Sequence, residues 1–232
     1  MVIAMILAHL VGDFVLQWDG LARWKASEWA GVLVHSVIIM LVTAAFALPF
    51  DRSWWDGILL ISASHLAIDS LWFFKKFSFS PLLRFGLDQV LHYLFIILAL
   101  AMTGYLQWGN IWGGILDSAR ATPLLTGLMG YAFITMPAWV LLKFVVYGLL
   151  KGQPPNFPAG PNNFVGISER LIITTLVLFG QVLLVPLVTL PRLIIEWPHV
   201  VNGGGDGVYV VELISSVMLA VGVGWFIGLL LF

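Results

Sequence analysis

The sequence predicts an all-α protein, a polytopic integral membrane helix bundle of about seven transmembrane spans. Hydrophobic residues make up 60% of the chain and charged residues only 10%, whereas about a quarter of the residues are charged in a soluble domain. The mean hydropathy is +1.00. The apolar residues also fall into runs close to the roughly 20 residues that a helix needs to cross a bilayer. The lipid bilayer is therefore the expected surroundings and first partner of this chain.

Seven apolar runs are candidate spans. We interpret the first as a retained span, because it lacks the basic start and the small-residue cleavage site of a signal peptide. The fifth is long and contains Pro137, which predicts a kink. Stretches rich in Gly, Pro and Asn at 153–163 and 201–207 are predicted loops. The seven runs cover 2–17, 30–50, 57–74, 85–106, 124–150, 167–190 and 208–231.

We expect these spans to form one bundle with two regions. Residues 1–106 are predicted to be a four-helix region that contains four of the five histidines, and residues 107–232 a three-helix C-terminal membrane region of the same bundle. The sequence gives no sign of a soluble second domain.

The Lys and Arg residues predict the orientation. If the spans alternate, eight of the 11 basic residues lie on the side reached after the first span, and the positive-inside rule makes that side cytoplasmic. This predicts an outside N-terminus and a cytoplasmic C-terminus. The eight are Arg23, Lys25, Lys75, Lys76, Arg84, Lys143, Lys151 and Arg170, and the other three are Arg52, Arg120 and Arg192.

Charge and cysteine content exclude several classes of function. The formal net charge is -1, so the chain has no basic excess with which to neutralise phosphates, and nucleic acid is not an expected partner. There is no cysteine, which removes disulfides, thiolate metal sites and cysteine nucleophiles. Any metal site must therefore use His, Asp and Glu.

The most informative pattern is a His/Asp pair four residues apart, which occurs three times inside apolar runs. Residues four apart lie on the same face of a helix. A further histidine stands alone in the second run. The set is His9 with Asp13, His65 with Asp69, Asp88 with His92, and the lone His35.

The predicted topology brings these seven groups to one depth. The first and third spans run inward, and the second and fourth run outward, so each pair has its carboxylate nearer the cytoplasmic end and its imidazole about 6 Å deeper. In the third pair the order is reversed, Asp88 before His92, as the reversed direction of its helix requires. The sequence therefore predicts a cluster near the cytoplasmic face.

Imidazole and carboxylate together suit a divalent metal, namely zinc, iron or manganese. Ionisable groups inside the hydrocarbon are costly, and they persist when they pair with one another, with a metal or with a water-filled path. The predicted metal ligands, for one ion or for two, are His9, His35, His65, His92, Asp13, Asp69 and Asp88. A metal could activate water for hydrolysis, with Asp13, Asp69 or Asp88 as a bridging ligand, as the hydrogen-bond partner of a ligand, or as general base.

Other interpretations of the same residues stay open. The pairs could be hydrogen-bonded contacts between helices, haem or pigment ligands, or part of a proton or ion pathway. The chain could also be a non-catalytic accessory subunit of a larger respiratory or photosynthetic membrane complex, because it shows no sizeable soluble domain.

Polar residues outside the pairs add to the candidate site. Gln17 and Gln89 continue the polar faces of their helices and are candidates for substrate contact or for hydrogen bonding to the cluster. At the start of the sixth run, Ser168 could cap the helix and Glu169 could favour its N-terminal dipole. Alternatively, Glu169 is catalytic and completes the acid/base set, and Arg170 binds an anionic substrate group such as a phosphate.

The motif combination resembles an uncharacterised bacterial membrane family catalogued as domain of unknown function 3307. The resemblance rests on His9-x-x-Gly-Asp13-Phe-x-x-Gln17, His35, His65-x-x-Ile-Asp69, Asp88-Gln-x-x-His92 and Gly166-x-x-Glu-Arg-Leu171. It implies a multi-pass protein of the bacterial inner membrane. More loosely, the His/Asp helices are similar to inner-membrane proteins labelled metal-dependent hydrolases. That similarity implies hydrolysis of a lipid or membrane-associated substrate at the cytoplasmic side.

Overall fold

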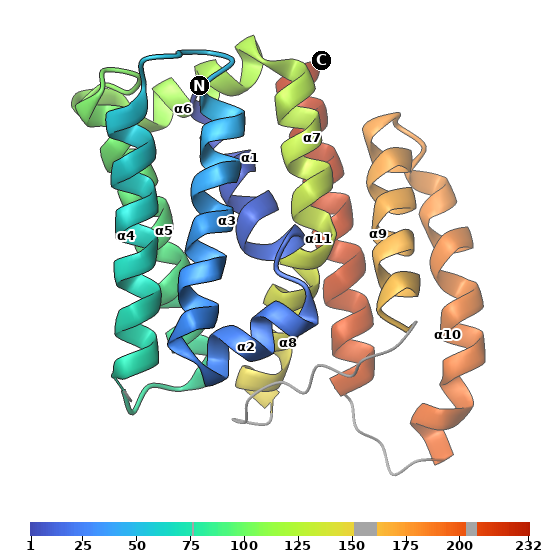
Figure 1. Cartoon of the computed structure of the whole chain (residues 1–232). Coiled ribbons are helices and arrows are strands. Elements are labelled where there is room, and N and C mark those ends of the chain that lie inside the picture. The colour runs from blue at the N-terminus through green and yellow to red at the C-terminus, as the bar shows by residue number, and fades with distance from the viewer. Residues whose placement is uncertain (76, 151–161, 203–207) are drawn as a thin grey trace. The chain divides into compact units, whose positions relative to one another are not determined.

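The computed structural model describes residues 1–75, 77–150, 162–202 and 208–232. None of these residues forms a strand, which confirms the predicted all-α class (Figure 1). The chain divides into two compact units, Met1–Phe79 with Leu83–Met129, and Ser80–Leu82 with Gly130–Phe232. Residues 107–129, which we had assigned to the C-terminal region, thus belong to the first unit.

The first unit consists of helices α1 to α6, apart from the first two residues of α5, and of the beginning of α7. The helix α1 continues into η1, a π-helical segment, and η2 is a short 3-10 helix. The elements are α1 (Val2–Leu10), η1 (Val11–Val15), α2 (Asp19–Ser27), α3 (Trp29–Ala47), α4 (Trp55–Phe74), α5 (Pro81–Met102), η2 (Trp108–Asn110), α6 (Ile111–Ala121) and α7 (Pro123–Ile134).

The helix α1 is the centre of this unit. Its residues are buried on nearly all sides, and a helix that is apolar all round is typical of such a position. The small side chains of Ala4 and Ala8 are 0% and 2% exposed and allow neighbouring helices to approach closely. His9 ends this apolar helix, so its imidazole lies inside the unit.

The chain turns sharply after η1. The Leu16 N–H donates to the Val11 carbonyl at 2.8 Å, the i to i−5 bond of a π-helix. The helix α2 then runs at 83° to the α1–η1 segment, across the bundle and not along it (Figure 1). The predicted first span therefore ends in a bend that returns the polar helix α2 toward the other helices.

The second unit contains the end of α7 and helices α8 (Met136–Leu150), α9 (Asn162–Leu178), α10 (Val185–Asn202) and α11 (Val208–Leu231), with a short 3-10 helix, η3 (Val182–Leu184), before α10. The predicted loop at 153–163 lies outside the described residues except for its last two, which begin α9. The predicted loop at 201–207 is described only at residues 201 and 202, which end α10.

Helices α7 and α8 are bent by 43° around Thr135, which confirms the kink predicted from Pro137. Proline lacks the N–H that would continue the helix ladder. The Arg170 side chain donates to the Ile134 and Thr135 carbonyls at 2.7 and 3.2 Å, so it satisfies backbone groups that the break exposes.

The predicted sixth span, 167–190, is wrong as a single helix. The chain turns at Gly180, whose φ of +74° is left-handed and suits glycine. Gly180 N–H donates to Val177 O, and Gln181 N–H to Leu176 O, a Schellman motif that ends α9. Ser168 is likewise not a helix cap, because α9 begins at Asn162.

Of the other six predicted spans, four agree with single helices of the described residues, and the first and the fifth fall on bent helix pairs. Four described helices, α3, α4, α5 and α11, are long and apolar enough to cross a membrane, or up to six spans exist if each bent pair counts as one. Their outer faces expose apolar side chains such as Leu59, Val90 and Met218, which suit contact with lipid. The chain is therefore a polytopic helical membrane protein.

Candidate metal centre

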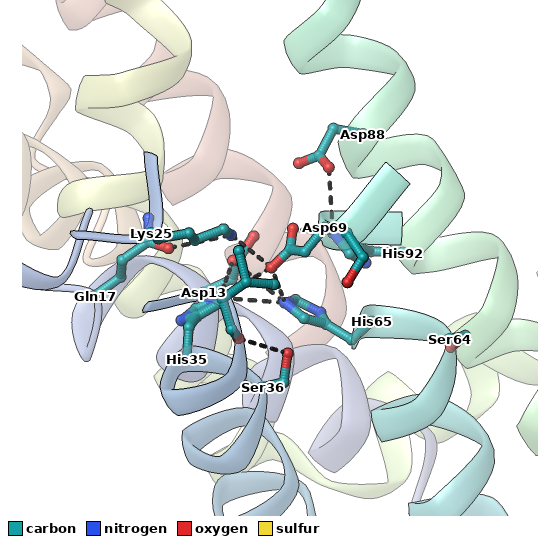
Figure 2. Close-up of polar contacts among 12 residues, drawn as sticks. Asp13, Gln17, Lys25, His35, Ser36, Ser64, His65, Asp69, Asp88 and His92 are labelled. Atoms are coloured by element: carbon teal, nitrogen blue, oxygen red, sulfur yellow. Dashed lines mark hydrogen bonds and ion pairs between the residues drawn. The ribbon is translucent and has the colours of Figure 1, made fainter. Parts of the chain in front are cut away.

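Four helices of the first unit bring the predicted His and Asp residues together. The α1–η1 segment supplies His9 and Asp13. Helix α3 supplies His35, α4 supplies His65 and Asp69, and α5 supplies Asp88 and His92 (Figure 2). All are buried except Asp88, whose side chain is 21% exposed. We call these seven residues the His/Asp cluster. Six of them are thus ionisable groups held out of water.

The tightest part of the cluster contains Asp13, His35 and His65. The His35 Nε2 atom lies 3.0 Å from Asp13 Oδ1 and 3.2 Å from His65 Nε2, and His65 Nε2 lies 3.8 Å from Asp13 Oδ1. Two nitrogen ligands of a tetrahedral zinc are about 3.3 Å apart when each Zn–N bond is about 2.05 Å. The three atoms are therefore spaced as ligands of one metal ion are.

Hydrogen bonds alone cannot satisfy this geometry. His65 Nε2 also lies 3.3 Å from Asp69 Oδ2, so a chain of three contacts runs from Asp13 through the two imidazoles to Asp69. A neutral imidazole nitrogen is either a donor or an acceptor. With both carboxylates ionised, at least one of the three contacts then brings two donors or two acceptors together, whichever tautomers are present. A cation between these atoms would relieve that contact.

Two further sets of described residues have the spacing of metal ligands. One is His65, Asp69 and His92, and the other is Asp13, Asp88 and His92, with one ligand atom per residue and all atoms within 4.8 Å of one another. The His65 and His92 rings stack with centroids 4.0 Å apart and an interplanar angle of 18°. Two-metal sites hold their ions about 3.5–4 Å apart, so stacked histidines suit neighbouring ions.

Asp13 is the residue that could join two such ions. The set of Asp13, His35 and His65 shares only Asp13 with the set of Asp13, Asp88 and His92. A carboxylate has two oxygens and can bridge, whereas one imidazole nitrogen binds one ion. The cluster can therefore hold one ion, or two ions bridged by Asp13.

His9 has a different position from the other predicted ligands. It belongs to none of the three sets found among the described residues. Its Nε2 lies 3.3 Å from Gln89 Oε1, and Gln89 Nε2 donates to Asp13 Oδ2 at 3.0 Å and to Asp88 Oδ2 at 3.1 Å. His9 therefore contacts Gln89, and Gln89 orients two carboxylates, one of them the shared Asp13.

The sequence analysis missed Lys25 as a member of this site. Lys25 lies on α2, and its Nζ is 2.7 Å from Asp69 Oδ2 and 3.4 Å from Gln17 Oε1 (Figure 2). We had counted Lys25 only as a cytoplasmic charge. The signal that was available is the polar stretch directly after the first span, but only the 83° bend shows that it returns to the cluster.

Glu169 and Arg170 have partners within the second unit. Glu169 Oε2 accepts from Arg192 at 2.8 Å. Arg170 is 3% exposed, and besides the two backbone carbonyls it donates to Ser216 Oγ at 3.2 Å. These contacts favour a structural role for Arg170 at the α7–α8 break.

Residues 1–111, which include the whole His/Asp cluster and Lys25, match the model of a family described as "Protein of unknown function (DUF3307)". No curated protein and no solved structure matches the chain.

Proposed function

Because the N-terminal half of this chain belongs to the DUF3307 family, whose description names no activity, we propose a function from the cluster itself. We propose that the protein binds a divalent metal inside the membrane and uses it to hydrolyse a lipid or another membrane-associated substrate. The observation that supports this most directly is the convergence of Asp13 Oδ1, His35 Nε2 and His65 Nε2 at 3.0, 3.2 and 3.8 Å.

The charge of the cluster supports cation binding. With neutral imidazoles, three carboxylates face one ammonium, that of Lys25, which leaves a formal excess of two negative charges. Buried charge without a counter-ion is costly. A divalent ion would balance this excess, and its ligands would be a mixture of nitrogen and oxygen atoms that suits zinc, iron or manganese.

The residues of the cluster have different roles in the proposed hydrolysis. His35, His65 and His92, with Asp13, Asp69 and Asp88, would hold the metal, which supplies Lewis acidity and makes a bound water more acidic. Asp88 is the most exposed of the carboxylates, so it would take the proton of the attacking water. The new bond joins the water oxygen to the carbonyl carbon or phosphorus of the substrate, the ester bond breaks, and the proton passes to the leaving oxygen.

The position of the cluster supports action at one membrane face. His35 lies in the first half of α3, Asp69 toward the end of α4 and Asp88 toward the start of α5, with His65 and His92 near the middle of their helices. The carboxylates of Asp69 and Asp88 thus lie toward the same end of the helices, and the imidazoles lie deeper. Arg23, Lys75 and Arg84 belong to segments at that end. The positive-inside rule therefore favours the cytoplasmic face of a bacterial inner membrane, with the N-terminus outside.

Turnover of lipid tests the proposal. Purified protein, supplied in turn with zinc, iron and manganese, is incubated in vesicles of bacterial phospholipids, and products are followed by mass spectrometry. We expect hydrolysed lipid from wild type and at least a ~100-fold lower rate from Asp69→Asn. The control is Asp117→Asn, which removes a carboxylate that is 76% exposed on α6. No product with any metal, or equal rates from wild type and Asp69→Asn, would overturn the hydrolase proposal.

A further inference from the structure

Lys25 is, among the described residues, the one Lys or Arg side chain that is ion-paired with the His/Asp cluster. Its Nζ lies 2.7 Å from Asp69 Oδ2, beside the Gln17 amide oxygen at 3.4 Å. An ammonium so close to three sets of metal ligands would repel a bound cation. A role in binding something negative therefore explains its position better than a role in holding the metal.

Lys25 and Asp88 form the accessible edge of the cluster. Their side chains are 22% and 21% exposed, whereas those of Asp13, Asp69 and the three histidines His35, His65 and His92 are at most 6% exposed. A substrate group can thus reach the cluster beside Lys25 without displacing a buried helix.

The backbone of α2 holds Lys25 in place. Gly31 of α3 lies so close to α2 that a Cβ there would be 2.5 Å from the Lys25 backbone nitrogen and 2.5 Å from the Trp24 carbonyl carbon. Two helices that approach this closely through a glycine pack rigidly. Lys25 is therefore presented from a fixed backbone position, although its side chain can move.

We infer that Lys25 binds the phosphate group of an anionic substrate, an inference that rests on the proposed function and names its substrate class. With two divalent ions bound, the formal charge of the cluster and Lys25 changes from −2 to +2, which suits a phosphate dianion. Phosphate oxygens can contact metal ions and an ammonium together. On binding, the phosphate replaces Asp69 as the ion-pair partner of the Lys25 ammonium, or both groups contact it together.

The surroundings of Lys25 favour a phosphate that belongs to a lipid. Trp18 and Trp24 are 59% and 38% exposed next to and on α2, and tryptophan concentrates where lipid head groups meet the hydrocarbon. The helix α2 also runs across the bundle axis, as a helix lying in that interface does. We therefore expect Lys25 to lie at the depth where phospholipids carry their phosphates.

Binding to inorganic phosphate and to phosphatidic acid tests this inference. Metal-loaded protein in detergent is titrated with each probe and followed by calorimetry, and the metal content of every sample is measured. We expect Lys25→Ala to bind both probes at least ~10-fold more weakly, and Lys25→Arg to keep most of the affinity. The matched control is Arg23→Ala, which removes an exposed positive charge from the same helix and should bind as wild type does.

The outcomes separate the two proposals. Tighter binding of phosphatidic acid than of inorganic phosphate identifies a lipid head group as the source, and equal affinities identify a free phosphate ester. A Lys25→Ala protein that retains its metal and binds phosphate as wild type does would overturn the role of Lys25, as would loss of metal from this variant. Absence of metal from wild type would instead overturn the proposed function. Lys25→Gln, which keeps a hydrogen-bond donor to Asp69, repeats the test if Lys25→Ala does not fold.

Discussion

The two units of this chain bury polar groups in different ways. In the second unit, Lys143 pairs with Glu212 at 2.9 Å and Arg192 with Glu169 at 2.8 Å, and Arg170 donates to two carbonyls and a hydroxyl. In the His/Asp cluster of the first unit, three carboxylates face one lysine. His35 Nδ1 has no hydrogen-bond partner among the described residues, and the contact of His92 Nε2 with Asp88 Oδ1 at 3.4 Å lacks hydrogen-bond geometry.

The difference indicates two kinds of buried polarity. Groups that satisfy one another stabilise a fold and have no need of a ligand, because each charge already has its partner. A cluster with excess negative charge and unpartnered nitrogens is a poor stabilising network, and such strain is common at functional sites. The comparison therefore supports the proposed ligand binding in the first unit and a structural role for the polar pairs of the second.

Removing one carboxylate from each unit tests this assignment with the largest expected effect. We expect Asp13→Asn to weaken metal binding at least ~100-fold, because Asp13 belongs to two of the three ligand sets. Glu212→Gln, the matched change in the second unit, should leave metal affinity unchanged. Both are measured by competition with a metal-binding dye. Equal metal affinities for the two variants would contradict the proposal that the first unit, and not the second, binds the metal.

Arg170→Met should lower the stability of the fold and leave metal binding unchanged. The change removes three hydrogen bonds and leaves the Ile134 carbonyl without a donor and the Thr135 carbonyl with only the Trp139 N–H, at a cost of about 2–3 kcal/mol in unfolding free energy. Unfolding in mixed micelles measures that cost, and metal content should stay at the wild-type value. A variant as stable as wild type, or one without metal, would show that Arg170 is no structural anchor.

Gly31→Ala tests whether the packing of α2 fixes the position of Lys25. The new Cβ would meet the backbone of Trp24 and Lys25, so α2 must shift, at about 1–3 kcal/mol. We expect weaker phosphate binding with the metal retained, seen by the titration described above. Gly86→Ala on α5 is the control, since a Cβ there meets nothing within 4 Å. Unchanged phosphate affinity in Gly31→Ala would contradict a fixed position for Lys25.

The smallest effect is expected at Asp51, in the loop between α3 and α4. Hydrogen bonds from the Ser53 hydroxyl and N–H, and from the Tyr105 hydroxyl at 2.9 Å, lower the pKa of Asp51. The stability that this group contributes is present above its unfolded pKa of about 3.9 and is lost as the pH falls through the lower folded pKa. Tyr105→Phe should raise the pKa of Asp51, measured by NMR titration, and leave metal binding unchanged. An Asp51 that titrates as in wild type would show that the phenol does not stabilise the carboxylate.

Much of the fold followed from local sequence features. Apolar runs of the right length predicted the four helices that can cross a membrane singly, α3, α4, α5 and α11, and Pro137 predicted the kink. The prediction of the sixth span was wrong because the mean hydropathy of residues 167–190 stays high even though the chain turns within them. Gly180 and Gln181 lie within an otherwise apolar run, and the left-handed backbone of Gly180 shows that α9 ends there.

The candidate site was predictable to the extent that it depends on helix periodicity. The i, i+4 spacing of His65 with Asp69 and of Asp88 with His92 places each pair on one helix face, and the structure brings these faces together. Lys25 could not be predicted, because its contact with Asp69 depends on the π-helical turn and the bend after it. The contact of His9 with Gln89 likewise depends on how α1 packs against α5.

Metal content tests the central claim most directly. Wild type and His35→Ala/His65→Ala are purified without chelators, checked for folding by circular dichroism and gel filtration, and analysed by mass spectrometry for zinc, iron and manganese. The claim predicts about one or two ions per chain in wild type and almost none in the folded double variant. Folded wild-type protein without metal, or equal metal in both proteins, would contradict it, and would make the His/Asp cluster a structural network of an accessory membrane subunit.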